Sequence, residues 1–235
     1  MKKCRYDYII AIGQNCFAPR VLLVNKLRQF SGPLDWLEFF NYSSAIDTLK
    51  EKFRNFFDKE NLVYFGINTD SYTDVYKNKR KIKFIHDFPV NSKGVEFDEL
   101  YTKSKEKYER RINRFIEKVR NSKALLLYIE WICLYKNNTG ITNKTLSADI
   151  KELNSIYNSN FDILYIKHNP DLKTDEYKIN KRICEINNIP SKGYLGNIDM
   201  VNEILSERVA LKAQGVVEQR IGIIKRLLNF YRIIV

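Results

Sequence analysis

The sequence has few of the residues from which metal sites and disulfide frameworks are built. Its only histidines are His86 and His168, and its four cysteines lie far apart, at positions 4, 16, 133 and 184, with no Cys-x-x-Cys pair. Neither residue type has the spacing of a zinc site, so we expect no metal and no other cofactor. The wide spacing of the cysteines also argues against a disulfide framework, so we expect their thiols to be reduced.

Long uninterrupted apolar runs are absent as well. No segment approaches the roughly 18 apolar residues of a membrane-spanning helix. The first residues lead into a mixed strand rather than into the apolar core of a signal peptide, so we expect a cytoplasmic protein. At 235 residues, 44% of them hydrophobic, the chain is predicted to form a single α/β domain over 1–235.

Acidic residues are outnumbered by basic ones, 28 against 40, which gives a net charge of +12. The excess is spread along the chain and accompanies no zinc-finger, helix-turn-helix or RNA-recognition signature, so no nucleic-acid partner is predicted. The bases concentrate only near the C-terminus, where the segment 215–235 is also apolar on several faces. We expect it to be a helix that closes the core, forms a homodimer or contacts the inner membrane face peripherally.

Short apolar segments alternate with amphipathic stretches along the chain. Strands are predicted at 9–12, 62–65, 81–88, 124–130 and 161–167, and helical periodicity lies between most of them. The polar stretch 68–81 is predicted to be a loop. This alternation predicts a three-layer, Rossmann-like fold, in which a mostly parallel sheet has helices on both faces.

The apolar run 9–12 ends at Gly13, which is predicted to form a permissive turn leading to Cys16. A helix is predicted to begin directly after Cys16. There the helix dipole and unpaired amide groups would lower the pKa of the thiol, as a nucleophile requires. Alternatively, Cys16 is a small buried apolar residue in a strand-to-helix turn.

Other polar residues follow predicted strands. Because the carboxyl ends of parallel strands meet at one edge of a sheet, we expect Cys16, His86, Glu130 and His168 to gather there. This predicts that Cys16 and His86 come within hydrogen-bonding reach. Alternatively, each histidine is partly buried and bonded to backbone.

Asp35 follows the helix-breaking Gly32-Pro33 turn and precedes Trp36. It could cap the next helix, orient the imidazole of His86 or bind a hydrogen-bond donor of the substrate. Asp199 is the alternative orienting residue. Asp87 suits that role less well, because adjacent residues of a strand point to opposite faces.

Three motifs occur in order along the chain. They are Ile12-Gly13-Gln14-Asn15-Cys16, Ser31-Gly32-Pro33-Leu34-Asp35-Trp36 and His86-Asp87-Phe88, followed by the basic segment 107–115. In this combination the first 130 residues resemble a bacterial family of unknown function labelled "putative papain-like cysteine peptidase". The resemblance implies that Cys16 is a nucleophile and His86 its partner. In papain-like enzymes, however, the oxyanion glutamine lies further before the cysteine than Gln14 does, and their architecture is not an alternating α/β one.

The sequence therefore predicts a cysteine-dependent hydrolase or acyl-transfer enzyme acting on a peptide or a small glycan-linked substrate. Its predicted catalytic residues are Cys16, His86 and Asp35, and the predicted substrate or oxyanion contacts are Gln14, Asn15, Trp36 and Asp87. The family also resembles proteins found among surface-glycan assembly genes. The alternative is thus a transferase or esterase of that process, in which Cys16 is structural.

Overall fold

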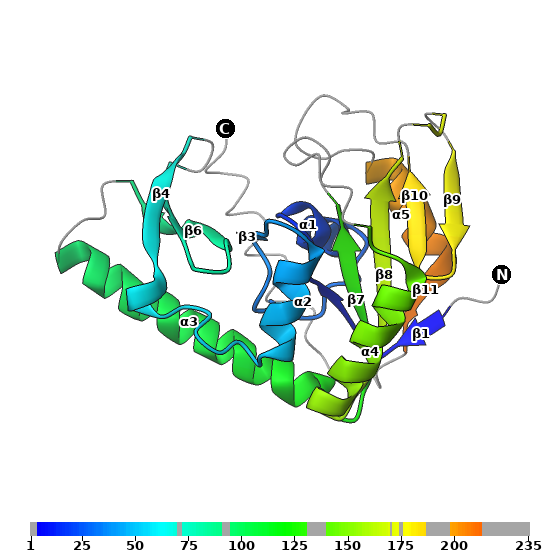
Figure 1. Cartoon of the computed structure of the whole chain (residues 1–235), viewed down its shortest axis with the longest axis horizontal. Helices are drawn as coiled ribbons and strands as arrows, with labels where there is room; N and C mark the ends of the chain where they lie inside the picture. Colours follow the sequence, from blue (N-terminus) through cyan, green and yellow to red (C-terminus); the bar gives the residue numbers. More distant parts are fainter. Residues whose placement is uncertain are drawn as a thin grey trace.

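Figure 1 shows a computed structural model of the chain. The structure describes residues 4–69, 72–90, 95–130, 140–169, 171–173, 176–186 and 198–212. The segment 215–235 lies outside the described residues. Its predicted helix, and the dimer or membrane contacts proposed for it, therefore stay predictions.

The larger sheet has five strands in the order β2-β7-β8-β10-β9. Four of them are parallel, namely β2 (Tyr8–Ala11), β7 (Lys123–Ile129), β8 (Asn160–His168) and β10 (Ile183–Ile186), and β9 (Tyr177–Asn180) is antiparallel at one edge. These strands are continuous apolar runs because both faces of the sheet are covered. The predicted mostly parallel sheet is present in this part of the fold.

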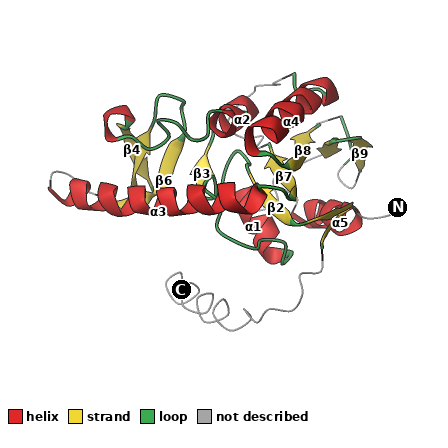
Figure 2. Ribbon diagram, turned by 90° about the horizontal axis from the view of Figure 1, so that it is seen from below, coloured by secondary structure: helices red, strands yellow, loops and turns green. Residues whose placement is uncertain are grey.

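Helices cover both faces of this sheet (Figure 2). Leu125 and Leu127 of β7 pack with α1 (Phe17–Val24) and α5 (Ile198–Arg208) on one face. Leu126 and Tyr128 belong to the core on the other face, which includes α2 (Tyr42–Lys50) and α4 (Asn143–Tyr157). A short β1 (Cys4–Tyr6) pairs in parallel with β11 (Val209–Leu211). The predicted three-layer α/β arrangement is thus confirmed around this sheet.

A second, antiparallel sheet was not predicted. Its order is β3-β6-β5-β4, formed by β3 (Leu37–Glu38), β6 (Lys83–Pro89), β5 (Thr73–Lys77) and β4 (Val63–Asn68). The prediction that 62–65 and 81–88 belong to one parallel sheet is wrong, because the connections between β4, β5 and β6 are too short for crossovers and form hairpins. The predicted loop at 68–81 contains β5, whose polar residues gave no strand signal.

The long helix α3 (Val95–Val119) runs beneath the antiparallel sheet and ends near the edge of the larger one (Figure 1). Tyr108 of α3 packs its ring against Phe57 and Phe84, with centroid distances of 4.8 and 5.6 Å. The buried Phe57 lies in the segment before the single 3₁₀ turn described, Lys59–Asn61. This aromatic cluster is buried, and each such ring contributes roughly 1.5–3 kcal/mol. It therefore fixes β6, and with it His86, against the body of the protein.

Candidate active site

Cys16 is presented by the turn that joins β2 to α1. A Cβ atom added to Gly13 would lie 2.6 Å from the Cβ of Ala18, so a glycine is needed here for the close approach of strand and helix. This close approach, rather than the permissive backbone predicted from sequence, is what requires the glycine. Asn15 Oδ1 accepts a hydrogen bond of 2.9 Å from the N–H of Phe17, which holds the chain at the start of the helix.

His86 comes from the antiparallel sheet, where it lies within β6 and not at the end of a strand. The pairing register moves from Asp74–Phe88 to Tyr76–Phe84, so two steps along β5 correspond to four along β6. The extra residues include His86, whose side chain is exposed while its neighbours on both sides are buried. Such bulges re-aim side chains near functional sites.

The two residues meet where the sheets adjoin. Cys16 Sγ lies 3.3 Å from His86 Nε2, although the two residues are 70 positions apart in sequence. The expected proximity is therefore observed, but its predicted cause is wrong. The two residues come from different sheets and not from one edge of a parallel sheet. Glu130 directly follows β7, and His168 is the last residue of β8.

Burial and nearby charge keep the thiol protonated. Desolvation raises the pKa of Cys16 to about 12, and the carboxylates of Glu38 and Asp35 act in the same direction. The prediction of a low thiol pKa is thus wrong, because these effects outweigh the helix N-terminus. His86 keeps exposed surface, yet partial desolvation lowers its pKa below 6.5; Asp87 opposes this shift and Lys107 adds to it. The pair is therefore a neutral thiol beside a neutral imidazole.

Asp35 neither caps the next helix nor contacts His86. Its Oδ2 accepts hydrogen bonds from Nε and an Nη atom of Arg28, at 3.0 and 2.6 Å, and from the N–H of Gly32 at 2.9 Å. The cap of α2 is Asn41, which accepts from the N–H of Ser44. Asp35 is 2% exposed, and burial raises its pKa against the attraction of Arg28. Arg28, which follows the end of α1, was not predicted from the sequence to be the partner of Asp35. Asp199, the alternative orienting residue, is exposed in the first turn of α5 and makes no hydrogen bond to His86.

Asp87 points away from the thiol, as expected for a neighbour of His86 on a strand. Its carboxylate accepts hydrogen bonds from the Lys107 ammonium and from Tyr108 Oη, the latter at 2.7 Å. The residue is 8% exposed. It therefore ties β6 to α3 and is not open to a substrate, contrary to the prediction.

The two amide side chains before Cys16 differ in their partners. Gln14 Nε2 donates to the carbonyl of Phe40 at 3.2 Å, so this amide is already engaged in the fold. Asn15 is buried, and its Nδ2 has no hydrogen-bond partner within the described part of the chain. A buried, unpaired donor is costly, by about 1–3 kcal/mol, and calls for an explanation. Of the two, Asn15 is the one with a free donor.

Trp36 has an unusual backbone conformation beside the pair. Its φ is +65°, in the left-handed region that a bulky residue rarely adopts. Such conformations carry roughly 1–3 kcal/mol of strain and occur mostly at functional sites. Its ring meets the His86 ring edge to face, with centroids 6.4 Å apart, and the Arg28 guanidinium lies 5.7 Å from the Trp36 centroid. Trp36 thus contacts the candidate base itself.

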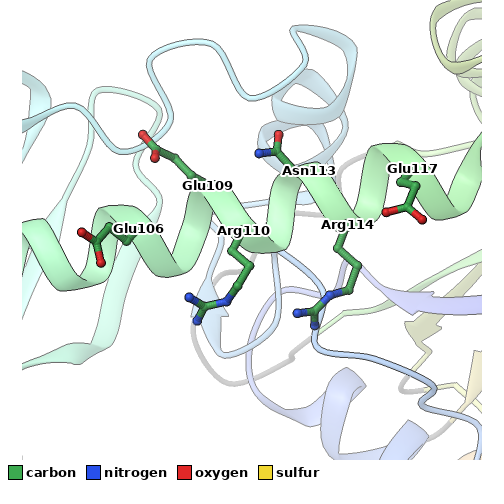
Figure 3. A pocket seen from close by; sticks show the side chains of 6 residues that line it. All are labelled: Glu106, Glu109, Arg110, Asn113, Arg114 and Glu117. Carbon is green, nitrogen blue, oxygen red and sulfur yellow. The ribbon is translucent and has the colours of Figure 1, made fainter.

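A hollow of about 560 Å³ lies elsewhere, along the outer stripe of α3 (Figure 3). The residues that line it are Glu106, Glu109, Arg110, Asn113, Arg114 and Glu117. Nearly all are exposed, whereas Tyr108 and Phe115 of the same helix face the core. The stripe has mixed charges and no nucleophile, so it is not the candidate site.

The described residues hold neither a metal cluster nor a membrane-spanning helix. No group of three or more His, Cys, Asp or Glu residues in this part of the chain could hold a metal ion. None of the helices placed there has the length and apolar character needed to cross a membrane.

A thiol in contact with an imidazole at a helix start is the arrangement that cysteine-dependent enzymes use. Residues 7–170 match the family model described as "Putative papain-like cysteine peptidase (DUF1796)". The match spans more than half of the chain, so the protein belongs to this family.

One relative is the "Uncharacterized protein R408" of Acanthamoeba polyphaga mimivirus. It is 26% identical over 181 residues, which are 70% of this chain and 79% of the relative. Because this relative is viral, the expectation of a bacterial family is not confirmed. No solved structure matches the chain significantly.

Proposed function

We propose that the protein is a cysteine-dependent hydrolase or acyl-transfer enzyme in which Cys16 is the nucleophile and His86 the general base. The observation that carries this proposal is the 3.3 Å contact between Sγ and Nε2. That contact depends on a glycine-tight turn and on a bulged strand. The proposed substrate is a peptide or a small glycan-linked molecule in the cytoplasm.

The neutral pair favours general-base chemistry. As Sγ attacks a carbonyl carbon, the thiol proton moves to Nε2, and the resulting imidazolium then protonates the leaving group. A thioester on Cys16 remains. Water, or an acceptor in a transfer reaction, then gives its proton to Nε2 as it attacks the thioester, and the departing sulfur takes that proton back.

The negative charge that develops on the carbonyl oxygen needs a donor. Asn15 Nδ2 is buried one residue before the nucleophile and has no partner among the described groups. We assign it the oxyanion role in preference to Gln14, whose amide donates to Phe40. Removing one such donor typically lowers the rate about 10²–10³-fold.

Acylation by 4-nitrophenyl acetate tests the proposal without knowledge of the natural substrate. We expect a burst of nitrophenolate and, by peptide mapping, an acetyl group on Cys16. Cys16→Ser and His86→Gln should abolish the burst. Cys184→Ser is the matched control, because burial also raises the pKa of Cys184 to about 12 and no histidine contact is found for it among the described residues.

The outcome of Cys16→Ser separates the two candidate classes. A serine variant that folds and keeps the full burst would remove Cys16 from catalysis. It would leave the transferase or esterase of surface-glycan assembly, in which this cysteine is structural.

A further inference from the structure

Among the residues that the structure describes, none orients the imidazole of His86 by a hydrogen bond to Nδ1. In the described part of the chain its only hydrogen-bond partner is Cys16, through Nε2. Two carboxylates that could orient it are engaged elsewhere, Asp35 with Arg28 and Asp87 with Lys107 and Tyr108. A general base must nevertheless be held in one orientation to act on its nucleophile.

The contact that the ring does make is with Trp36. The two rings meet at an interplanar angle of 80°, the edge-to-face geometry that aromatic rings prefer. Because the left-handed backbone of Trp36 is unfavourable for a bulky side chain, it persists only where the surroundings determine it. Contacts with neighbouring residues must therefore hold Trp36 in this conformation.

The Arg28–Asp35 ion pair is the feature that does so. Asp35 is almost fully buried and receives two hydrogen bonds from the Arg28 guanidinium. Arg28 also donates to Ser31 Oγ at 3.0 Å, so the guanidinium is fixed at two points. The guanidinium carbon lies over the Trp36 ring, 5.7 Å from its centroid, which is a cation–π contact.

We propose that Trp36, held by the Arg28–Asp35 ion pair, is the positioning residue that fixes the His86 imidazole against Cys16 in place of an acceptor on Nδ1. Its catalytic meaning rests on the proposed function, but the ring geometry does not. Asp35 thus acts on the imidazole through two intermediate side chains and not by direct contact.

Nuclear magnetic resonance of the histidine side chains tests this directly. The chain has only two histidines, so the spectrum of His168→Gln assigns the signals of His86. The variants are Trp36→Leu, which removes the ring, and Trp36→Phe, which keeps an aromatic edge. The matched control is Phe97→Leu. The Phe97 ring is also half-buried and makes a cation–π contact with an ion-paired residue, Lys59, but it belongs to α3 and not to the candidate site.

In Trp36→Leu we expect the His86 ring signals to broaden, because the imidazole exchanges between several orientations. Its titration should move up toward pH 6.5, because water replaces the indole. We also expect acetylation of Cys16 to slow at least tenfold. Trp36→Phe should recover most of both properties, and Phe97→Leu should change neither.

Folded Trp36→Leu protein whose His86 signals and titration match the wild type would overturn the proposal. If that variant does not fold, Arg28→Lys decides: it keeps the charge but loses the planar fork, and unchanged His86 signals in it would equally refute the role. Failure of the proposed function looks different. In that case Cys16 is not acetylated in the wild type, while Trp36→Leu still moves the His86 signals.

Discussion

The rate at which iodoacetamide alkylates Cys16 should rise with pH through the whole neutral range. A thiol with a pKa of about 12 is ionised to about one part in 10⁵ at pH 7, against about one part in 10² at the usual value of 9.0. The three-unit difference corresponds to about 4 kcal/mol against the thiolate. A more basic thiolate is also a better nucleophile, by a Brønsted slope of about 0.4–0.5, which recovers about 15–30-fold. We therefore expect Cys16 to react about 30–60-fold more slowly than a small peptide thiol at pH 7.

Replacing a nearby carboxylate tests whether negative charge raises the pKa of Cys16. Of the two carboxylates that raise the pKa of Cys16, Glu38 has the larger effect, and it also forms an ion pair with Lys83. Glu38→Gln removes this carboxylate and releases the Lys83 ammonium, so the alkylation rate at fixed pH should increase. Glu51→Gln is the matched control, because it removes a carboxylate that is paired with Arg80 elsewhere. Peptide mapping separates Cys16 from the other cysteines. A rate that levels off between pH 6 and 8 would mean a thiolate–imidazolium pair and would refute the reasoning.

Three further outcomes are expected. Acylation by 4-nitrophenyl acetate should fall on the acid side with a midpoint below pH 6.5, because desolvation lowers the pKa of His86 and only the neutral imidazole accepts the proton; a midpoint above 6.5 would contradict this. Gly13→Ala should destabilise the fold by about 1–3 kcal/mol in urea denaturation. Ala18→Gly should be less destabilising in the Gly13→Ala protein than in the wild type, because it relieves the contact between the two Cβ atoms. Additive effects of the two substitutions would exclude this close contact. Asn15→Ser keeps an acceptor for the helix start but loses the amide donor, so the acylation rate should drop about 10²–10³-fold. The free energy of unfolding should not fall, because the substitution also removes an unpaired buried donor. An unchanged acylation rate would remove Asn15 from the oxyanion site.

Local pattern was sufficient for the part of the fold in which strands are buried on both faces. The apolar runs before Cys16 and at 124–130 are continuous because helices cover them on either side, and this composition is visible in a short window of sequence. The same window places Cys16 at the start of a helix and puts Asp87 on the side of its strand opposite to His86. These features depend on residues close together in the chain.

Pairing direction, bulges and electrostatics depend instead on residues far apart. Nothing local shows that β6 joins an antiparallel sheet, or that extra residues in it aim His86 at a cysteine 70 positions earlier. The pKa of Cys16 is decided by burial and by Glu38, which the fold brings beside the thiol. The engagement of Asp35 by Arg28, which leaves Trp36 against the imidazole, is likewise a matter of distance and packing. The sequence alone thus determined which residue types carry the candidate chemistry, and only the tertiary structure decided which charges surround them, because desolvation and Coulomb energies are set by distances in space.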